Sequence, residues 1–99
     1  MKYYTEGFIA DIAVKAENII VFFQPVPPYL IDDTKKVCLL LSDNDLEAKL
    51  LPCNDKMQCE VSISRLDMTT AVMLMLNHRK IRILTADDNT KMFDEWRTI

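Results

Sequence analysis

Four residues of this chain belong to types that bind transition metals or act as nucleophiles and bases: Cys38, Cys53, Cys59 and the single histidine, His78. Five residues lie between Cys53 and Cys59, and with His78 these two cysteines could supply three zinc ligands. This spacing matches no common zinc knuckle, and no second Cys or His pair completes a four-ligand set. We therefore expect no metal site and interpret the cysteines as reduced thiols that fill apolar space.

The remaining residue types do not predict catalysis. His78 falls at an expected helix end, where a positive side chain interacts favourably with the helix dipole, so we interpret it as a helix-terminal residue rather than a general base. The sequence has one glycine and contains no glycine-rich phosphate loop, nucleophile elbow or His-Glu zinc motif. Three acidic pairs lack the glycine and distal glutamate of a calcium loop and suit turns: Asp32/Asp33, Asp43/Asp45 and Asp87/Asp88. We expect a protein that is not an enzyme and has no cofactor.

One group of basic and aromatic residues could bind nucleic acid or a glycan. Its members are Arg79, Lys80, Arg82, Lys91 and Trp96. Single-strand binding needs a positive groove and exposed rings on which bases stack, and the tyrosines at positions 3, 4 and 29 are further candidates for such rings. The net charge of −3 argues against strong affinity for phosphates, so a solvated strand face is the simpler interpretation.

A helix over residues 66–76 is expected to position these basic residues. The segment Ser64-Arg65-Leu66-Asp67 has the spacing of a capping box, in which the Ser64 hydroxyl accepts from an amide of the first turn and Asp67 reaches back to the cap. The run that follows is apolar nearly all round, which predicts burial on more than one side. Asn77 suits a left-handed residue at the helix end, and the chain then enters a strand over Arg79–Thr85.

Alternation and short apolar runs predict strands around this helix. Phe8–Ala16 has apolar even positions and is expected to form a hairpin with Ile19–Phe23 across a turn at Glu17-Asn18. The prolines within Gln24–Tyr29 end the second strand; they match a Pro-x-x-Pro ligand motif but suit a stiff connector. Further strands are expected over Val37–Leu41, Leu46–Leu50, Met57–Ile63 and Lys91–Ile99, the last with a short helix as the alternative.

This order of elements predicts a mostly β fold with one helix, arranged over residues 1–99 as a single domain. We expect a small Greek-key barrel of the oligonucleotide/oligosaccharide-binding (OB) type, with an α+β sandwich as the alternative. The opening GFIADIAVKAENIIVFF and the later passage TTAVMLMLNHRKIRILTADDNTKMFDEWRTI resemble, in their order of elements, the B-subunit-like barrels of bacterial AB5 toxins. The resemblance implies a barrel and a ring or other oligomer. We do not extend it to toxin function, because a secretion signal and a disulfide pair are not evident.

The chain has more apolar surface than a small barrel with one helix can bury. The runs IIVFF and VCLLL are apolar on both faces, and we expect four helix residues to form an oligomer interface: Met68, Val72, Met73 and Met75. The expected function is a noncatalytic interaction protein, a homo-oligomer that binds and inhibits another macromolecule. A ligand-binding OB-like barrel for a small polar molecule, glycan or oligonucleotide is the alternative, and a monomer that encloses both runs is the alternative to self-association.

Composition indicates a globular chain, since 49% of the residues are hydrophobic and 27% are charged. Lys2, Glu6, Asp11, Lys15 and Glu17 interrupt the N-terminal apolar residues, which argues against a signal peptide or a membrane span. We expect a cytoplasmic protein without a membrane partner.

Overall fold

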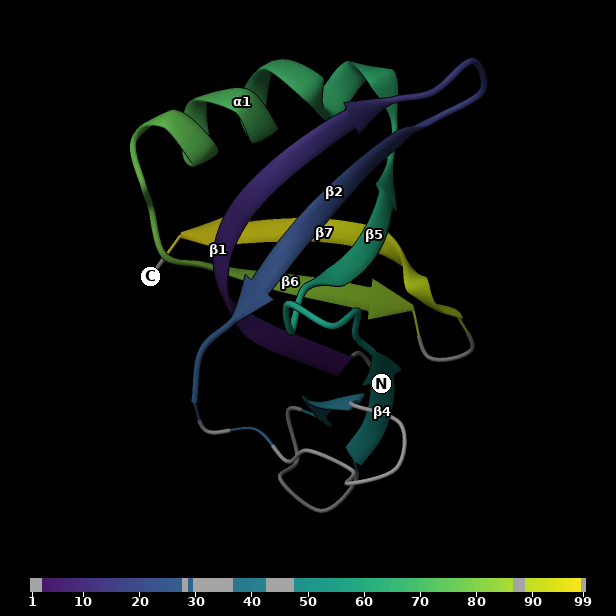
Figure 1. Cartoon of the computed structure of the whole chain (residues 1–99), viewed down its shortest axis with the longest axis vertical. Helices are drawn as coiled ribbons and strands as arrows, with labels where there is room; N and C mark the ends of the chain where they lie inside the picture. The colour runs from purple at the N-terminus through teal and green to yellow at the C-terminus, as the bar shows by residue number, and fades with distance from the viewer. Residues whose placement is uncertain (1–2, 28, 30–36, 43–47, 87–88, 99) are drawn as a thin grey trace.

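The computed structural model describes residues 3–27, 29, 37–42, 48–86 and 89–98, with side chains described through Leu84. The fold is mostly β with a single α-helix, as predicted (Figure 1). In chain order the elements are β1 (Tyr3–Val14), β2 (Ile19–Pro25), β3 (Val37–Ser42), β4 (Ala48–Pro52), β5 (Cys59–Ile63), the 3-10 turn η1 (Arg65–Asp67), α1 (Met68–Leu76), β6 (Ile81–Ala86) and β7 (Asn89–Thr98).

The strands form one largely antiparallel sheet in the order β2-β5-β7-β6-β1-β3-β4, with an additional pairing between β1 and β2. Long antiparallel ladders join β1 to β2 and β6 to β7. The contact between β5 and β7 is parallel and consists of one pair, Ser62 with Met92, so the sheet is not closed into a barrel. The expected closed barrel is therefore not what the described strands form, and the OB-like arrangement remains a prediction.

The inward face predicted for Phe8–Ala16, the even positions, is wrong before the bulge, because Ile9 is buried and Ala10 is exposed. The buried residues that precede the predicted strand, Tyr3, Thr5 and Gly7, continue this odd-numbered face. A bulge between Ile9 and Asp11 shifts the register with β2. Because an extra residue turns the following side chains to the other face, Ile12 packs against the core although it is at an even position, while Val14 is exposed.

The other strands follow the apolar pattern to different extents. β5 has the predicted face, with Cys59, Val61 and Ile63 buried. β4 does not: Leu50 is exposed and Leu51 is buried, while Leu46, the first residue of the predicted strand, lies outside the described residues. The C-terminal segment forms strand β7 rather than a short helix.

The predicted cap of the helical segment is confirmed at Ser64, whose Oγ accepts a hydrogen bond from the amide of Leu66 at 3.1 Å. The first turn is a 3-10 turn, and Asp67, as the N-cap of α1, makes no side-chain cap hydrogen bond, so the reciprocal half of the capping box is not formed. At the other end the left-handed residue is His78, with φ of 52°, rather than Asn77. The His78 ring stacks on Phe8 of β1 with 5.1 Å between ring centroids, which fixes the chain where it leaves the helix.

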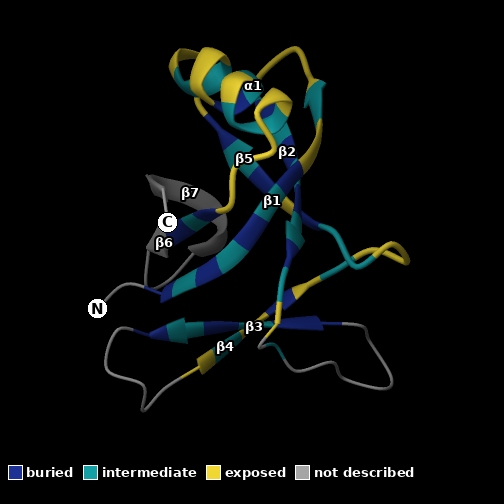
Figure 2. Ribbon diagram, turned by 90° about the vertical axis from the view of Figure 1, so that its left-hand side faces the viewer, coloured by how far each residue is buried: buried dark blue, intermediate teal, exposed yellow. Residues whose placement is uncertain are grey.

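The expected burial of the helix on more than one side is wrong. Ala71 is buried, and Met68, Leu74 and Met75 pack against the core. The opposite side faces solvent (Figure 2), where Leu66 is 93% exposed, Leu76 71% and Met73 54%. The sheet covers one side of α1 and leaves an apolar outer face.

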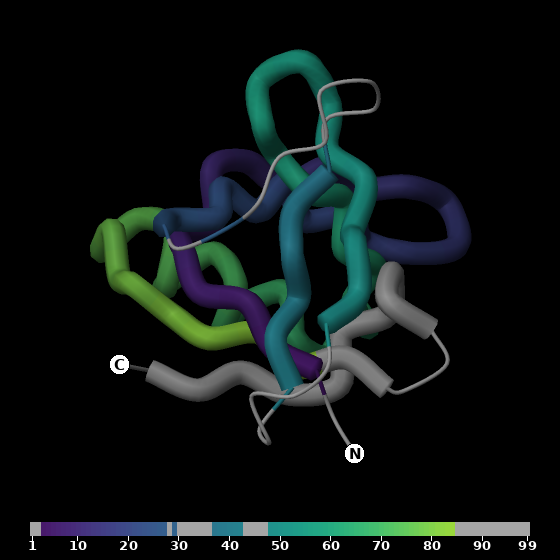
Figure 3. The backbone as a smooth tube through the Cα atoms, turned by 90° about the horizontal axis from the view of Figure 1, so that it is seen from below, coloured from purple at the N-terminus to yellow at the C-terminus, as the bar shows by residue number. Residues whose placement is uncertain are grey.

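The core has two parts. The larger part lies under α1 and contains residues of β1, β2, β5 and β6, including Phe23, Val61 and Ile83. The smaller part is formed by Tyr3, Cys38, Leu40, Leu51 and Cys59, and it lies by the β3–β4 hairpin, whose strands run side by side in Figure 3. Of the predicted acidic turns, residues 32, 33, 43, 45, 87 and 88 lie outside the described residues. Among the described helices, none has the length and apolar character needed to cross a membrane.

Candidate functional site

The three cysteines of the chain converge in the smaller core. Cys38 lies on β3, Cys53 follows β4, and Cys59 begins β5. The Sγ atom of Cys53 lies 2.8 Å from that of Cys38 and 2.9 Å from that of Cys59, and all three sulfur atoms lie within 4.8 Å of one another. All three are free thiols. We call this group the thiol cluster.

Strand pairing explains why residues so far apart in sequence meet here. Cys38 is paired with Leu51 in the β3–β4 hairpin, and Cys53, two residues beyond Leu51, points to the same face. Cys53 is then paired with Cys59 through an isolated antiparallel bridge. The sequence suggested His78 as the possible third ligand beside Cys53 and Cys59. Within the described part of the chain, the residue that lies beside these two cysteines is Cys38.

A tight turn holds Cys53 and Cys59 opposite each other. The Asn54 Oδ1 atom accepts hydrogen bonds from the amides of Lys56 at 2.9 Å and Gln58 at 3.0 Å. The Asn54 amide donates to the Gln58 carbonyl at 3.0 Å, and Met57 adopts a positive φ of 61°. An asparagine side chain that satisfies two turn amides stabilises such a loop, so the separation of the two thiols is fixed by the backbone.

The environment of the thiol cluster favours one negative charge shared among three sulfur atoms. Hydrogen bonding with Cys59 lowers the pKa of Cys38 to about 7, although burial opposes this shift. Burial raises the pKa of Cys53 to about 12, and hydrogen bonding with Cys38 raises the pKa of Cys59 well above its usual range. Among the three thiols, Cys38 is thus the one whose ionised form is favoured by hydrogen bonds from its neighbours.

The thiol cluster is open to solvent on the Cys53 side. Cys38 and Cys59 are fully buried, whereas Cys53 is half-buried. A cavity of about 260 Å³ adjoins Cys53 and is lined also by Leu51, Pro52, Asn54, Gln58 and Glu60. This cavity gives a small ion or reagent a path to the sulfur atoms.

The predicted basic group does not form one open positive surface. The guanidinium of Arg82 donates to Glu6 Oε1 from Nη2 at 2.7 Å and from Nε at 3.2 Å, and it lies 4.1 Å from the centre of the Tyr4 ring. Lys80 Nζ lies 3.8 Å from Glu6 Oε2. Glu6 therefore neutralises much of the charge expected to attract phosphates.

The other members of the basic group are not shown to join Arg82 and Lys80. Arg79 is exposed at the end of the helical segment, and the side chains of Lys91 and Trp96 on β7 are not among those described. Of the candidate stacking rings, Tyr3 is buried with Lys49 Nζ 4.5 Å from its ring centre, and Tyr29 packs against the smaller core. The structure thus brings together Arg82, Lys80 and Tyr4 from the predicted binding residues.

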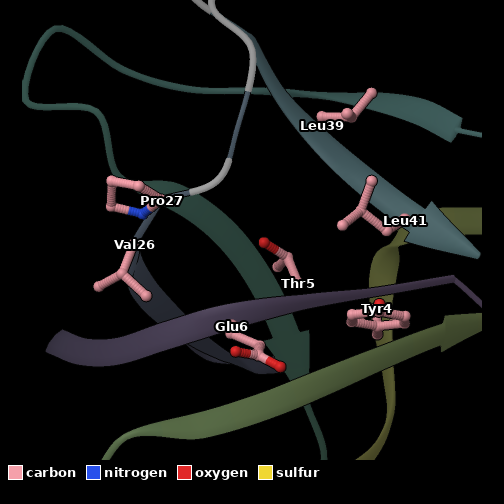
Figure 4. Close-up of a pocket in the computed structure, with 7 residues that line it drawn as sticks. All are labelled: Tyr4, Thr5, Glu6, Val26, Pro27, Leu39 and Leu41. Carbon is pink, nitrogen blue, oxygen red and sulfur yellow. The ribbon is translucent and has the colours of Figure 1, made fainter.

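A cavity of about 120 Å³ lies next to this ion pair, and its lining residues are shown in Figure 4: Tyr4, Thr5, Glu6, Val26, Pro27, Leu39 and Leu41. Of the described residues that line it, Glu6 alone is charged, and its carboxylate is already bound to Arg82. A volume this small accommodates a few heavy atoms, and is below the roughly 300–1,000 Å³ of typical ligand pockets.

The four predicted interface residues do not lie on one face of α1. Met68 and Met75 pack against the core, Val72 is half-buried, and Met73 belongs to the outer face. We define the outer helix face as Leu66, Met73 and Leu76. It adjoins a groove lined by Thr69, Thr70, Met73, Leu74, Asn77 and Arg79.

Comparison with known proteins gives no relative from which to assign a function, because no family model, curated protein sequence or solved structure matches the chain.

Proposed function

We propose that this protein is a noncatalytic interaction domain that associates with a second copy of itself through the outer helix face, and that in this form it binds and inhibits another macromolecule. The observation that carries the proposal is the exposure of Met73 and Leu76 on one side of α1, whose other side is already packed, together with exposed Leu66 in the preceding 3-10 turn η1. Large apolar side chains gathered on a surface favour association, because covering them removes apolar area from water.

A second copy is the simplest occupant of this face. The helix residues Met68–Leu76 include no charged side chain, so two copies can meet about a two-fold axis without burying an ionised group. Asp67 precedes this segment and Arg79 follows it, so an antiparallel pair of helices places opposite charges near each other at both ends.

The expected dimer is weak. Fully burying a leucine or methionine contributes about 1.5–3 kcal/mol, so six such side chains at the interface contribute on the order of 10 kcal/mol. Loss of translational and rotational freedom costs an estimated 4–15 kcal/mol. Association is therefore expected to depend on concentration within the range accessible to solution measurements.

The test is the solution mass measured by light scattering across dilution for the wild type and two variants. Met73→Glu introduces a charge on the outer helix face, and Leu50→Glu makes the same change on β4, where the side chain is 51% exposed against 54% for Met73. We expect the wild type and Leu50→Glu to dimerise at high concentration and Met73→Glu to stay monomeric. A wild type that is monomeric at every concentration, or a Met73→Glu variant that dimerises like the wild type, would refute the proposal.

We also propose that the fold is a partly open relative of the OB barrel. The pairings β1-β2, β2-β5, β6-β7 and β6-β1 arrange five strands in the series β5-β2-β1-β6-β7. The single β5-β7 contact joins the two ends of this series, which gives the cyclic strand order expected of a five-stranded Greek-key barrel and supports the proposal. The helix between β5 and β6 has the place that this arrangement requires. The β3–β4 hairpin is then an insertion that adds the smaller core.

Binding of a small polar molecule, glycan or oligonucleotide remains the second candidate function, on the strength of the Arg82, Lys80 and Tyr4 group alone. A single-stranded oligonucleotide that raises the melting temperature in proportion to its concentration would support it, and Arg82→Met should abolish that shift.

A further inference from the structure

We propose that the thiol cluster is a three-thiolate site for a thiophilic d10 cation such as Zn2+, with a fourth coordination position open to the cavity beside Cys53. Cys38, Cys53 and Cys59 come from three separate segments, and their sulfur atoms all lie within 4.8 Å of one another. Thiolates are the ligands that select such soft cations over Mg2+ or Ca2+.

The observed sulfur positions need only a local change to accept the ion. At a Zn–S bond length of about 2.3 Å, tetrahedral thiolates are roughly 3.8 Å apart. The two short separations, 2.8 and 2.9 Å, both involve Cys53, so an outward movement of about 1 Å by this half-buried side chain opens the site.

Metal binding leaves the cluster with only a small net charge. Binding exchanges each S–H proton for a metal–sulfur bond and releases the protons to solvent, with no change of oxidation state. Three thiolates with one divalent cation leave a single negative charge. The fourth ligand is a water molecule that enters from the cavity beside Cys53.

A disulfide is the competing use of the same residues. It would join Cys53 to one neighbour, leave the third thiol unused and require an oxidant. The geometry favours the metal because Cys53 lies equally close to both partners and all three sulfur atoms converge on one point.

The experiment is a Co2+ titration of the full chain, reduced and freed of metal, followed by displacement with Zn2+. We expect one Co2+ per chain, the near-ultraviolet charge-transfer absorption of thiolate–cobalt bonds, and a melting temperature that rises with added Zn2+. Cys53→Ser is the principal variant because this side chain is half-buried, whereas Cys38 and Cys59 are fully buried and their replacement would disturb the core more. It should lower the affinity by more than the roughly 10–100-fold that changes to outer-shell groups cost.

Glu60→Gln is the matched control, because it keeps the three sulfurs and changes one exposed group in the same cavity. It should retain the charge-transfer absorption. The proposal is refuted if the reduced wild type binds no Co2+ or Zn2+, if Cys53→Ser binds as tightly as the wild type, or if the bound cobalt lacks thiolate absorption. Rapid disulfide formation without metal uptake by the reduced protein would assign the cluster to redox chemistry instead.

Discussion

Gly7 offers a sharp test of the fold, because replacing it with alanine is expected to lower the free energy of unfolding, whereas the same replacement in a strand usually raises it. A glycine inside a strand ordinarily weakens it, and replacing it with alanine gains roughly 0.5–1 kcal/mol. Here a Cβ atom at Gly7 would lie 2.0 Å from the Gln24 carbonyl oxygen and 2.8 Å from the Pro25 Cα atom, both in the backbone of β2. We therefore expect Gly7→Ala to be strongly destabilising.

The size of the effect follows from how far β2 must move. An ordinary contact begins at 3.4 Å, so the Gln24 carbonyl would have to retreat by 1.4 Å, the difference between 3.4 and 2.0 Å. That movement disrupts the adjoining pairing of Gly7 with Pro25 and the hydrogen bond from the Val26 amide to the Glu6 carbonyl at 2.9 Å. A buried group left without its partner costs about 1–3 kcal/mol, and overpacking costs about as much again. The total is about 2–6 kcal/mol, a large part of the roughly 5–15 kcal/mol that holds a domain folded.

Urea unfolding followed by circular dichroism measures this loss. With a slope of about 1–3 kcal/mol per molar urea, the midpoint should fall by roughly 2 M without a change in slope. Ala10→Val adds a larger side chain at an exposed position of the same strand and should stay within about 0.5 kcal/mol of the wild type. A Gly7→Ala variant as stable as the wild type would show that β1 and β2 do not approach each other as described.

Two smaller predictions test local contacts. Ser64→Ala should lower the free energy of unfolding by about 1 kcal/mol, because it removes the acceptor of the Leu66 amide; an unchanged urea midpoint would mean that the cap contributes nothing. A double-mutant cycle of Glu6→Gln and Arg82→Met should give a coupling of about 0.5–1 kcal/mol at this half-exposed pair, and Arg82→Lys should not restore it, since lysine lacks the two-nitrogen contact; additive effects would contradict this assignment.

The sequence predicted the strands and the helix well but their faces less well. Alternation located β5 and its buried side because every residue there follows one period. In β1 the alternation of apolar residues predicted the wrong face, because the bulge between Ile9 and Asp11 interrupts the two-residue period. No residue type at these positions indicates a bulge. For α1, an apolar run does not say which side a sheet will cover, so an exposed face was indistinguishable from a buried one.

The thiol cluster was missed for a different reason. Reasoning from spacing along the chain paired Cys53 with Cys59 and left Cys38 out, because 15 residues and a hairpin separate Cys38 from Cys53. The strand pairing of residues 37–41 with residues 48–52 would have located the cluster. Once Cys38 is opposite Leu51, Cys53 must lie on the same face of the hairpin as Cys38. Residues 43–47 connect these two strands, and a connection of this length does not fix the register from the sequence as a two-residue hairpin loop does.

The outer helix face and the thiol cluster can be tested independently, and each supplies a control for the other. Helix α1 lies at one end of the molecule and β4 at the other (Figure 1). Among the side chains that the structure describes, no buried residue belongs both to the core under the helix and to the core that contains the cysteines. Effects of changes at sites without common partners usually add. Met73→Glu should therefore keep the cobalt stoichiometry of the wild type, and Cys53→Ser should keep its dependence of mass on concentration. If either variant altered both properties, metal binding and self-association would be coupled through β1, which contributes Tyr3 to one core and Ile9 to the other.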